Sequence, residues 1–160
     1  DSSIDPVERI AEEYYTAASV ITLEESGMTL TEDYLVKRQL DSENSQILEE
    51  FYATADGTLT SVVLNVDVEN RTFTLQFSDD SYTGTGSFVG EGLEWSSWES
   101  HSVHQDGSYV LSEDEKNSQG IQTSKSGYSA ADELDWSLTE ELLPISEQEW
   151  TELYNALPAQ

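Results

Sequence analysis

The chain has 160 residues, with 33 Asp and Glu against 6 Lys and Arg, which gives a formal net charge of −27. This balance argues against binding to nucleic-acid phosphates, which needs clustered Lys and Arg, and against contact with an anionic membrane surface. The sequence contains no Cys, which excludes disulfides, thiolate metal sites and a Cys nucleophile. No apolar stretch approaches the ~20 residues of a membrane helix, so we expect no membrane insertion. The length predicts a single domain over residues 1–160.

The acidic residues are dispersed along the chain rather than gathered in a tail. They recur as pairs such as Glu12-Glu13, Glu49-Glu50 and Glu140-Glu141. Two explanations stay open: adaptation to salt, as in halophilic or marine organisms, or a charged surface that faces a partner. The chain begins at Asp1 with no initiator Met and no signal peptide. We therefore expect a processed, exported protein (periplasmic, envelope-associated or secreted), with the cytoplasm of a salt-accumulating organism as the alternative.

Residues 1–20 carry the pattern of an N-terminal helix. Asp5 suits the N-cap, Pro6 the first helical position and Glu8 the capping box. Apolar residues then recur at helical spacing. These are Val7, Ile10, Ala11, Tyr14 and Ala18.

Residues 21–143 change to a period of two, which predicts an antiparallel β-meander. In the stretch 71–78, Phe73, Leu75 and Phe77 alternate with polar residues, as in a half-buried strand. Turn dipeptides such as Asp56-Gly57 and Asp106-Gly107 separate such stretches. The polar segment 112–118 is predicted to be a mobile loop. The other predicted strands cover residues 34–40, 46–55, 59–68, 82–89, 93–104, 108–112, 121–126 and 134–142.

Residues 144–160 predict a C-terminal helix. Ser146 serves as N-cap with Glu149 as its capping-box partner, and Pro158 marks the end. Trp150 and Leu153 begin its apolar stripe. The expected fold is therefore mainly β: an antiparallel up-and-down meander forming a curved sheet or (half-)barrel, with an N-terminal and a C-terminal helix as covers or plugs.

This order of elements, with a meander rich in Thr, Ser and aromatic residues, resembles the lipocalin-like (calycin) β-barrel proteins. The resemblance is architectural and covers most of the chain. The family's early Gly-x-Trp signature is absent, since Trp95 follows Gly92 by three residues and lies mid-chain. The resemblance implies a concave ligand cavity, and no binding residues are carried over from it.

The segment 95–104 is the densest candidate site. On a regular strand Trp95, Glu99 and His101 share one face, which suits either a cavity wall or an acid/base pair. A strand with one core Trp and ordinary histidines is the plainer interpretation. We expect no cofactor and no metal site, although acid-rich turns such as 113–115 allow weak divalent cation binding. The candidate ligand-binding residues are Phe73, Leu75, Phe77, Trp95, Glu99, His101 and Trp136.

Three functions remain open from the sequence. The first is a non-enzymatic binding module that holds a small apolar ligand or a protein partner in the concave sheet. The second is an acidic decoy that mimics DNA and occupies a basic protein. The third is a hydrolytic enzyme that uses Glu99 and His101, or the carboxylates of residues 132–135.

Overall fold

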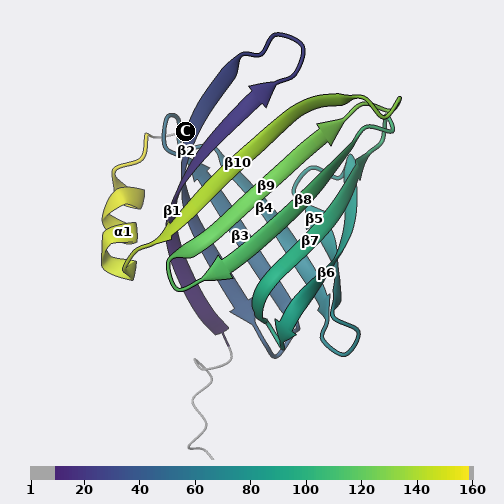
Figure 1. Ribbon diagram of the computed structural model, residues 1–160. Coiled ribbons are helices and arrows are strands. Elements are labelled where there is room, and N and C mark those ends of the chain that lie inside the picture. The colour runs from purple at the N-terminus through teal and green to yellow at the C-terminus, as the bar shows by residue number, and fades with distance from the viewer. Residues whose placement is uncertain (1–9, 159–160) are drawn as a thin grey trace, which may run out of the picture.

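The computed structural model describes residues 10–158, which form ten strands and one helix (Figure 1). The element order confirms the predicted mainly-β meander with a C-terminal helix. The strands are β1 (Ile10–Leu23), β2 (Thr29–Asp41), β3 (Gln46–Ala53), β4 (Leu59–Asp67), β5 (Thr72–Phe77), β6 (Tyr82–Glu91), β7 (Glu94–His104), β8 (Tyr109–Asn117), β9 (Gly120–Tyr128) and β10 (Leu134–Pro144). The helix is α1 (Glu147–Asn155). Within the described part of the chain, no helix is long and apolar enough to cross a membrane.

The sheet closes into a barrel. Every strand pairs antiparallel with its neighbour in sequence, and β1 completes the circle by pairing with β10 from Tyr15↔Pro144 to Leu23↔Trp136. Closure leaves no free sheet edge, so the backbone N–H and C=O groups that an edge strand would expose are paired with a neighbouring strand. The strands are joined by short turns, so alternate turns lie at the same end of the barrel (Figure 1).

The pleat sends alternate side chains into the barrel. On β2, Val36 and Arg38 are fully buried inside, at 0% and 2% exposure, while Lys37 between them lies on the outer wall. The same alternation on β3 to β10 builds a continuous interior. The core cluster comprises Tyr15, Ala17, Val36, Leu40, Ile47, Leu64, Phe73, Phe88, Leu93, Trp95, Trp98, Ile121 and Leu142.

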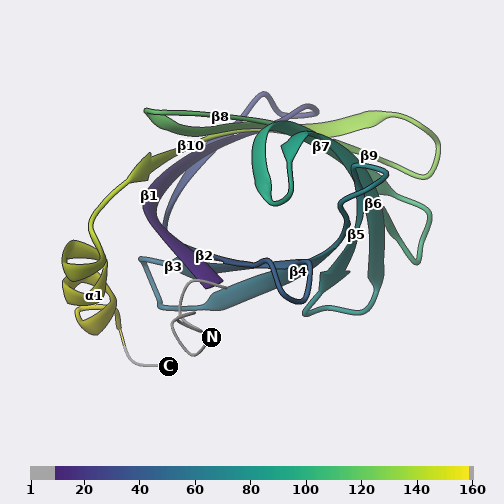
Figure 2. The ribbon, with the colours of Figure 1, turned by 90° about the horizontal axis from the view of Figure 1, so that it is seen from below.

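The two ends of the barrel differ. We call the end at which β1 begins the lower end, and the end with the β1–β2 turn the upper end. At the lower end the β6–β7 turn lies within the ring of strands (Figure 2). There Trp95 stacks on Phe88 and Phe73, with ring centroids 4.2 and 5.2 Å apart, and its Nε1 donates to the Gly92 carbonyl. This aromatic plug closes the lower end.

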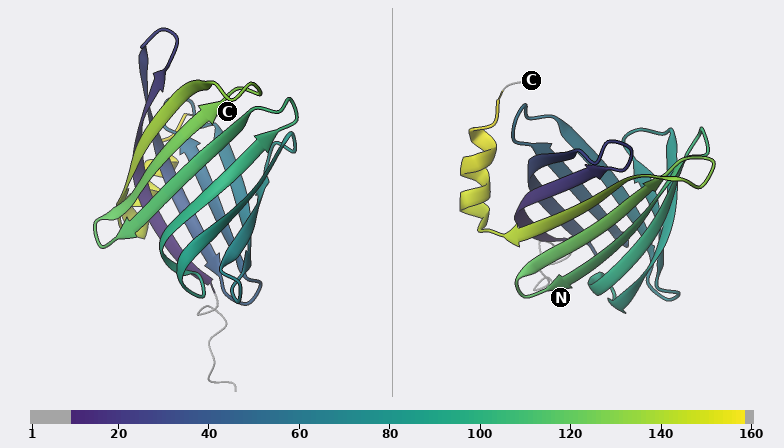
Figure 3. Two further views of the ribbon diagram at one scale, coloured as in Figure 1. Left: turned by 45° about the vertical axis from the view of Figure 1, so that its right-hand side comes forward. Right: turned by 45° about the horizontal axis from the view of Figure 1, so that its top comes forward.

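Helix α1 packs on the outside of the barrel rather than plugging it (Figure 3). Ser146 accepts a hydrogen bond from the Glu149 backbone N–H, which confirms the predicted N-cap. Trp150 is the buried residue of the helix and donates its Nε1–H to the Val36 carbonyl at 2.9 Å. Its ring also contacts Tyr14 on β1, so α1 is fixed to the wall formed by β1 and β2.

The predicted N-terminal helix is wrong over residues 10–20, which form most of β1; Asp5, Pro6 and the rest of the predicted cap lie outside the described residues. Both faces of β1 bury apolar groups, because Tyr15 faces the core and Tyr14 lies under Trp150 of α1. Apolar residues therefore stand on both faces of β1, which hides the period of two and leaves a spacing that looks helical. Pairing with β2 and β10 stabilises this segment as a strand and outweighs its helical spacing.

The predicted mobile loop over residues 112–118 is also wrong. Residues 109–117 form β8, which pairs along its length with β7 and β9. Its charged side chains alternate, with Asp114 and Lys116 half-buried and Glu113 and Glu115 exposed. The sequence shows no apolar alternation here, because the inward residues Asp114 and Lys116 are charged like their outward neighbours, and the segment therefore looks like a solvated loop.

Candidate functional site: a cavity inside the barrel

A cavity of about 270 Å³ occupies the barrel interior above the aromatic plug. It opens toward the upper end, because its upper lining residues Phe77, Tyr82 and Trp136 are half-buried whereas Leu64, Phe73 and Ile121 below them are buried. The full lining is Glu49, Phe51, Val62, Leu64, Phe73, Leu75, Phe77, Tyr82, Trp98, Ser100, Ser102, Val110, Ser112, Asp114, Ile121, Thr123, Lys125, Trp136, Glu140 and Leu142.

One wall of the cavity is apolar and comes mainly from β4 and β5. Phe73 reaches across the neighbouring strand because Gly86 carries no side chain; a Cβ there would lie 2.2 Å from Phe73 Cζ. Gly127 likewise leaves room for the Trp136 ring, which lies against it. These glycines therefore give space to bulky neighbours, which lets the aromatic rings lie along the wall.

The opposite wall comes from β7 to β10 and carries most of the polar groups of the cavity, beside the apolar side chains of Trp98, Ile121 and Trp136. The register places Asp114 beside Thr123, and Thr123 beside Glu140. Thr123 Oγ1 donates to Asp114, and Glu140 accepts from Ser19 on β1. The next row toward the upper end contains Ser100, Ser112 and Lys125. A ligand in the cavity would thus meet hydroxyl and charged groups mainly on the side of β7 to β10, and apolar groups on the side of β4 and β5.

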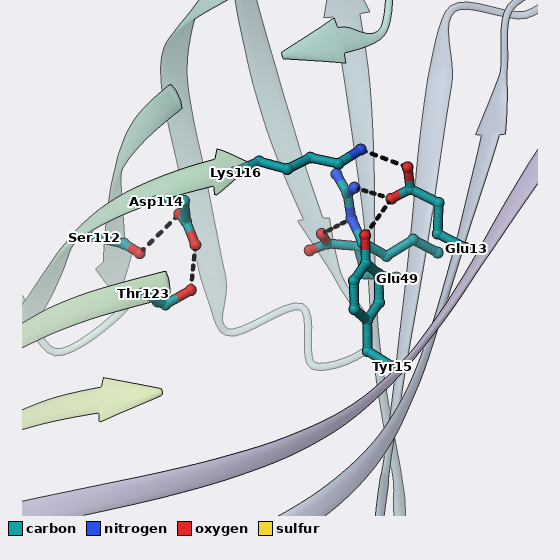
Figure 4. Close-up of polar contacts among 8 residues, drawn as sticks. Glu13, Tyr15, Glu49, Ser112, Asp114, Lys116 and Thr123 are labelled. Carbon is teal, nitrogen blue, oxygen red and sulfur yellow. Dashed lines mark hydrogen bonds and ion pairs between the residues drawn. The ribbon is translucent and has the colours of Figure 1, made fainter. Parts of the chain in front are cut away.

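An ion-pair cluster lies below the polar wall (Figure 4). Arg38 donates from Nη1 to Glu13 at 2.6 Å and from Nε to Glu49 at 2.8 Å. Lys116 forms a second ion pair with Glu13, and the Tyr15 hydroxyl donates to the same carboxylate at 2.9 Å. Two cations and two carboxylates balance in charge, so the cluster closes this part of the barrel without leaving a buried charge unpaired.

The interior holds half of the chain's Lys and Arg: Arg38 and Lys116 in the ion-pair cluster and Lys125 in the cavity wall. Burial opposes ionisation of Glu13, but the charges of Arg38 and Lys116 outweigh it and hold the pKa of Glu13 below its usual value. In an acidic chain, placing half of the scarce cations inside makes the interior electrically distinct from the surface.

The carboxyls of the cavity wall behave differently. Burial raises the pKa of Asp114 to about 6, although the Thr123 hydrogen bond opposes this rise. Burial also raises the pKa of Glu140, against the hydrogen bond from Ser19. Lys125 acts on both carboxyls through its charge alone, since none of the ion pairs among the described residues includes it.

Four of the predicted ligand-binding residues lie together in the cavity wall: Phe73, Leu75, Phe77 and Trp136. Trp95 does not line the cavity; it belongs to the aromatic plug beneath it. No ligand tests the binding role of any of these residues, so that role stays a prediction.

Glu99 and His101 lie outside the barrel, contrary to the expectation that they share a face with Trp95. The register shifts between Val89 and Gly90, which pair with Ser97 and Trp95 and so leave one extra residue on β7. The bulge turns both Trp95 and Trp98 inward and leaves Glu99 and His101 exposed. His101 packs its ring against Tyr109 on the outer wall.

Sequence reasoning missed the polar wall. Asp114, Lys125 and Glu140 come from three strands and share no sequence motif, so only the register of the barrel brings them together. Among the described residues, no group of three or more His, Asp or Glu side chains is arranged to hold a metal ion. No protein-family model matches the chain, and no curated protein matches it either.

Proposed function

We propose that the protein is a non-enzymatic binding module that holds one small ligand inside the barrel. The observation that carries this proposal is the cavity inside the barrel, which opens toward the upper end and combines apolar side chains and aromatic rings with polar groups from β7 to β10. Ligand sites are concave, mostly apolar and marked by a few convergent polar groups, and this cavity has each of these properties. The lipocalin-like resemblance supports the same function, since those barrels enclose ligands.

The cavity sets limits on the ligand. At about 270 Å³ the cavity lies just below the usual range for small-molecule sites, which indicates a compact ligand of one or two fused rings. The rings of Phe73, Phe77 and Trp136 offer flat contact surfaces, and Ser102 and Ser112 add hydroxyls to the same cavity lining. We therefore propose a ligand with an apolar ring body and one polar group.

The test is calorimetric titration with 1-naphthalenemethanol, a neutral ring system with one hydroxyl. Ser102 is buried in the cavity wall, and its neighbour Val103 on the same strand is exposed outside. We expect Ser102→Phe to fill the cavity and weaken binding by about tenfold or more, while Val103→Phe leaves binding unchanged. The thermal midpoints of both variants check that the barrel is still folded.

Equal binding by the wild type and the folded Ser102→Phe variant would place the probe elsewhere and overturn the proposal. Should Ser102→Phe unfold, Ser112→Phe fills the cavity from β8, with Leu111→Phe as its outward control. A wild type that binds neither this probe nor any of a panel of similar neutral ring compounds would equally count against the binding module.

The acidic decoy is a second candidate, and one feature of the outer wall favours it. Glu99 on β7 stands directly opposite Glu113 on β8, both exposed, with Glu115 two positions further along. Like charges opposite each other destabilise a sheet, so their presence suits a surface that meets a basic partner. Binding to a basic protein that weakens when Glu99 and Glu113 become Gln, but not when Glu24 and Glu25 do, would favour the decoy.

A further inference from the structure

The acidic charge is unequal at the two ends of the barrel. The five turns at the upper end carry eight acidic residues and no Lys or Arg. The four strand-to-strand turns at the lower end carry two acidic residues and one Arg. The upper acidic residues are Glu24, Glu25, Asp56, Asp79, Asp80, Asp106, Asp132 and Glu133. The five turns around the open end of the cavity are therefore more acidic than the four turns at the lower end, where Asp41, Asp67, Glu91 and Glu94 stand at the ends of strands.

Hydrogen bonds in these turns keep several of the carboxylates ionised. The Ser108 side chain and backbone N–H lower the pKa of Asp106 to about 2. The backbone N–H of Thr58 lowers the pKa of Asp56, and that of Ser81 lowers the pKa of Asp79. The negative potential at the mouth thus persists well below neutral pH and draws cations toward the opening.

The charged groups inside the cavity also favour a cation. The ion-pair cluster of Arg38, Lys116, Glu13 and Glu49 is balanced, so it contributes little net charge. The remaining wall groups are Asp114 and Glu140 against the single cation Lys125. A ligand with a positive charge would balance this wall, whereas a negative ligand would add to an existing excess.

We propose that the ligand of the barrel is a small organic cation, an amine on an apolar ring body, whose ammonium lies against the wall formed by Asp114 and Glu140. This inference rests on the proposed binding function and adds the charge of the ligand to it. The rings of Trp136 and Tyr82 line the same cavity and provide faces on which a cation is stabilised. The mouth concentrates the cation, and the wall then neutralises it.

The test compares three compounds of the same shape in calorimetric titrations at pH 7.5: 1-naphthylmethylamine, 1-naphthalenemethanol and 1-naphthoate. We expect the amine to bind about tenfold more tightly than the alcohol, and the carboxylate to bind most weakly. Raising KCl from 0.05 to 0.5 M, in the range where screening becomes strong, should weaken the amine severalfold and leave the alcohol nearly unchanged.

Two pairs of variants separate the wall from the general charge of the surface. Asp114→Asn and Glu140→Gln each remove a carboxylate from the cavity, while Glu113→Gln and Glu141→Gln remove one from the exposed positions beside them. We expect both inner variants to weaken the amine about threefold to tenfold and to leave the alcohol within about twofold. The outer variants, with the same change in net charge, should leave the amine within about twofold.

The outcomes distinguish the two proposals. If the alcohol binds and the amine binds no more tightly, the cationic ligand is overturned while the binding function stands. If the carboxylate binds most tightly, Lys125 is the anchor and the charge of the ligand is reversed. If the outer variants weaken the amine as much as the inner ones, the preference belongs to the surface potential and not to the cavity wall.

Discussion

Arg38 is the residue on which the lower interior of the barrel depends. Its guanidinium is 2% exposed, pairs with Glu13 and Glu49, and lies 5.2 Å from the centre of the Trp98 ring. A buried ion pair adds little to stability as a whole, but removing one partner leaves the others charged in a low-dielectric environment. Removing Arg38 is therefore expected to lower the stability of the barrel by more than its ion pairs add to it.

We expect Arg38→Met to lower the free energy of unfolding by about 3 to 5 kcal/mol, because Glu13 and Glu49 lose their common cation. Arg38→Lys should recover only part of this, since an ammonium cannot reproduce the forked geometry. Urea unfolding followed by circular dichroism measures both. Arg71→Met is the matched control, because Arg71 is 57% exposed with Glu91 3.9 Å away, and it should change the free energy by less than about 1 kcal/mol. An equal loss in both variants would contradict the assignment.

Ionisation of the buried Asp114 carboxyl lowers the stability of the barrel, so this stability depends on pH. Its folded pKa of about 6 lies above the usual value of 3.8, so the stability that the protonated form contributes is present below pH 4 and is lost as the pH rises through 6. Asn cannot ionise, so Asp114→Asn should gain stability relative to the wild type between pH 4 and 7. We expect a relative gain on the order of 1 to 2 kcal/mol, measured by urea unfolding at each pH. Glu113→Gln, exposed on the same strand, should show no comparable gain; a flat difference for Asp114→Asn would contradict the raised pKa.

At the scale of elements, the sequence predicts strands best where only one face is buried. The alternation of Phe73, Leu75 and Phe77 survives intact in β5, and Ser146 caps α1 as expected. The sequence pattern does not predict a strand for β1, where α1 covers the outer face, or for most of β8, where Asp114 and Lys116 occupy inward positions. Both failures arise from tertiary partners, a docked helix and a buried polar network, that no local pattern reports.

Trp150 is expected to fix α1 to the barrel. Trp150→Ala removes the buried ring and the hydrogen bond to the Val36 carbonyl, and should lower the free energy of unfolding by about 3 kcal/mol. Binding of 1-naphthalenemethanol should stay within about twofold of the wild type, because α1 lies outside the cavity. Leu153→Ala, on the same helix but 42% exposed, should cost less than about 1 kcal/mol. An unchanged stability in Trp150→Ala would mean that α1 is not held in this position.

At the scale of the whole molecule, the sequence predicts a concave site and only part of its lining. The aromatic part of the lining was predictable, because Phe73, Phe77 and Trp136 are large apolar residues in segments that the sequence predicts as strands. The polar half was not, because it depends on the register of strands far apart in sequence and on closure between β1 and β10. The bulge that turns Trp95 inward also left no sequence signal besides the nearby glycines.

The net charge of −27 sets the response of the molecule to salt. If the acids act mainly through repulsion and through the potential at the mouth, the thermal midpoint in KCl should rise at first and level off by about 1 M, where the Debye length is roughly 3 Å. Differential scanning calorimetry from 0.05 to 3 M KCl, a series that brackets this limit, measures the curve. A midpoint that keeps climbing to the highest concentration would instead attribute the charge to adaptation to a saline habitat.

The measurement that tests the central claim most directly is a titration of the protein, with its Trp side chains labelled with ¹⁵N, by 1-naphthylmethylamine. The four indole N–H signals report different places: Trp98 and Trp136 line the cavity, Trp95 lies in the plug, and Trp150 belongs to α1 on the outside of the barrel. A ligand inside the barrel should shift the Trp98 and Trp136 signals most and leave Trp150 in place. A shift of Trp150 with Trp98 and Trp136 unmoved would put the ligand outside the barrel, beside α1, and would contradict a ligand site in the cavity.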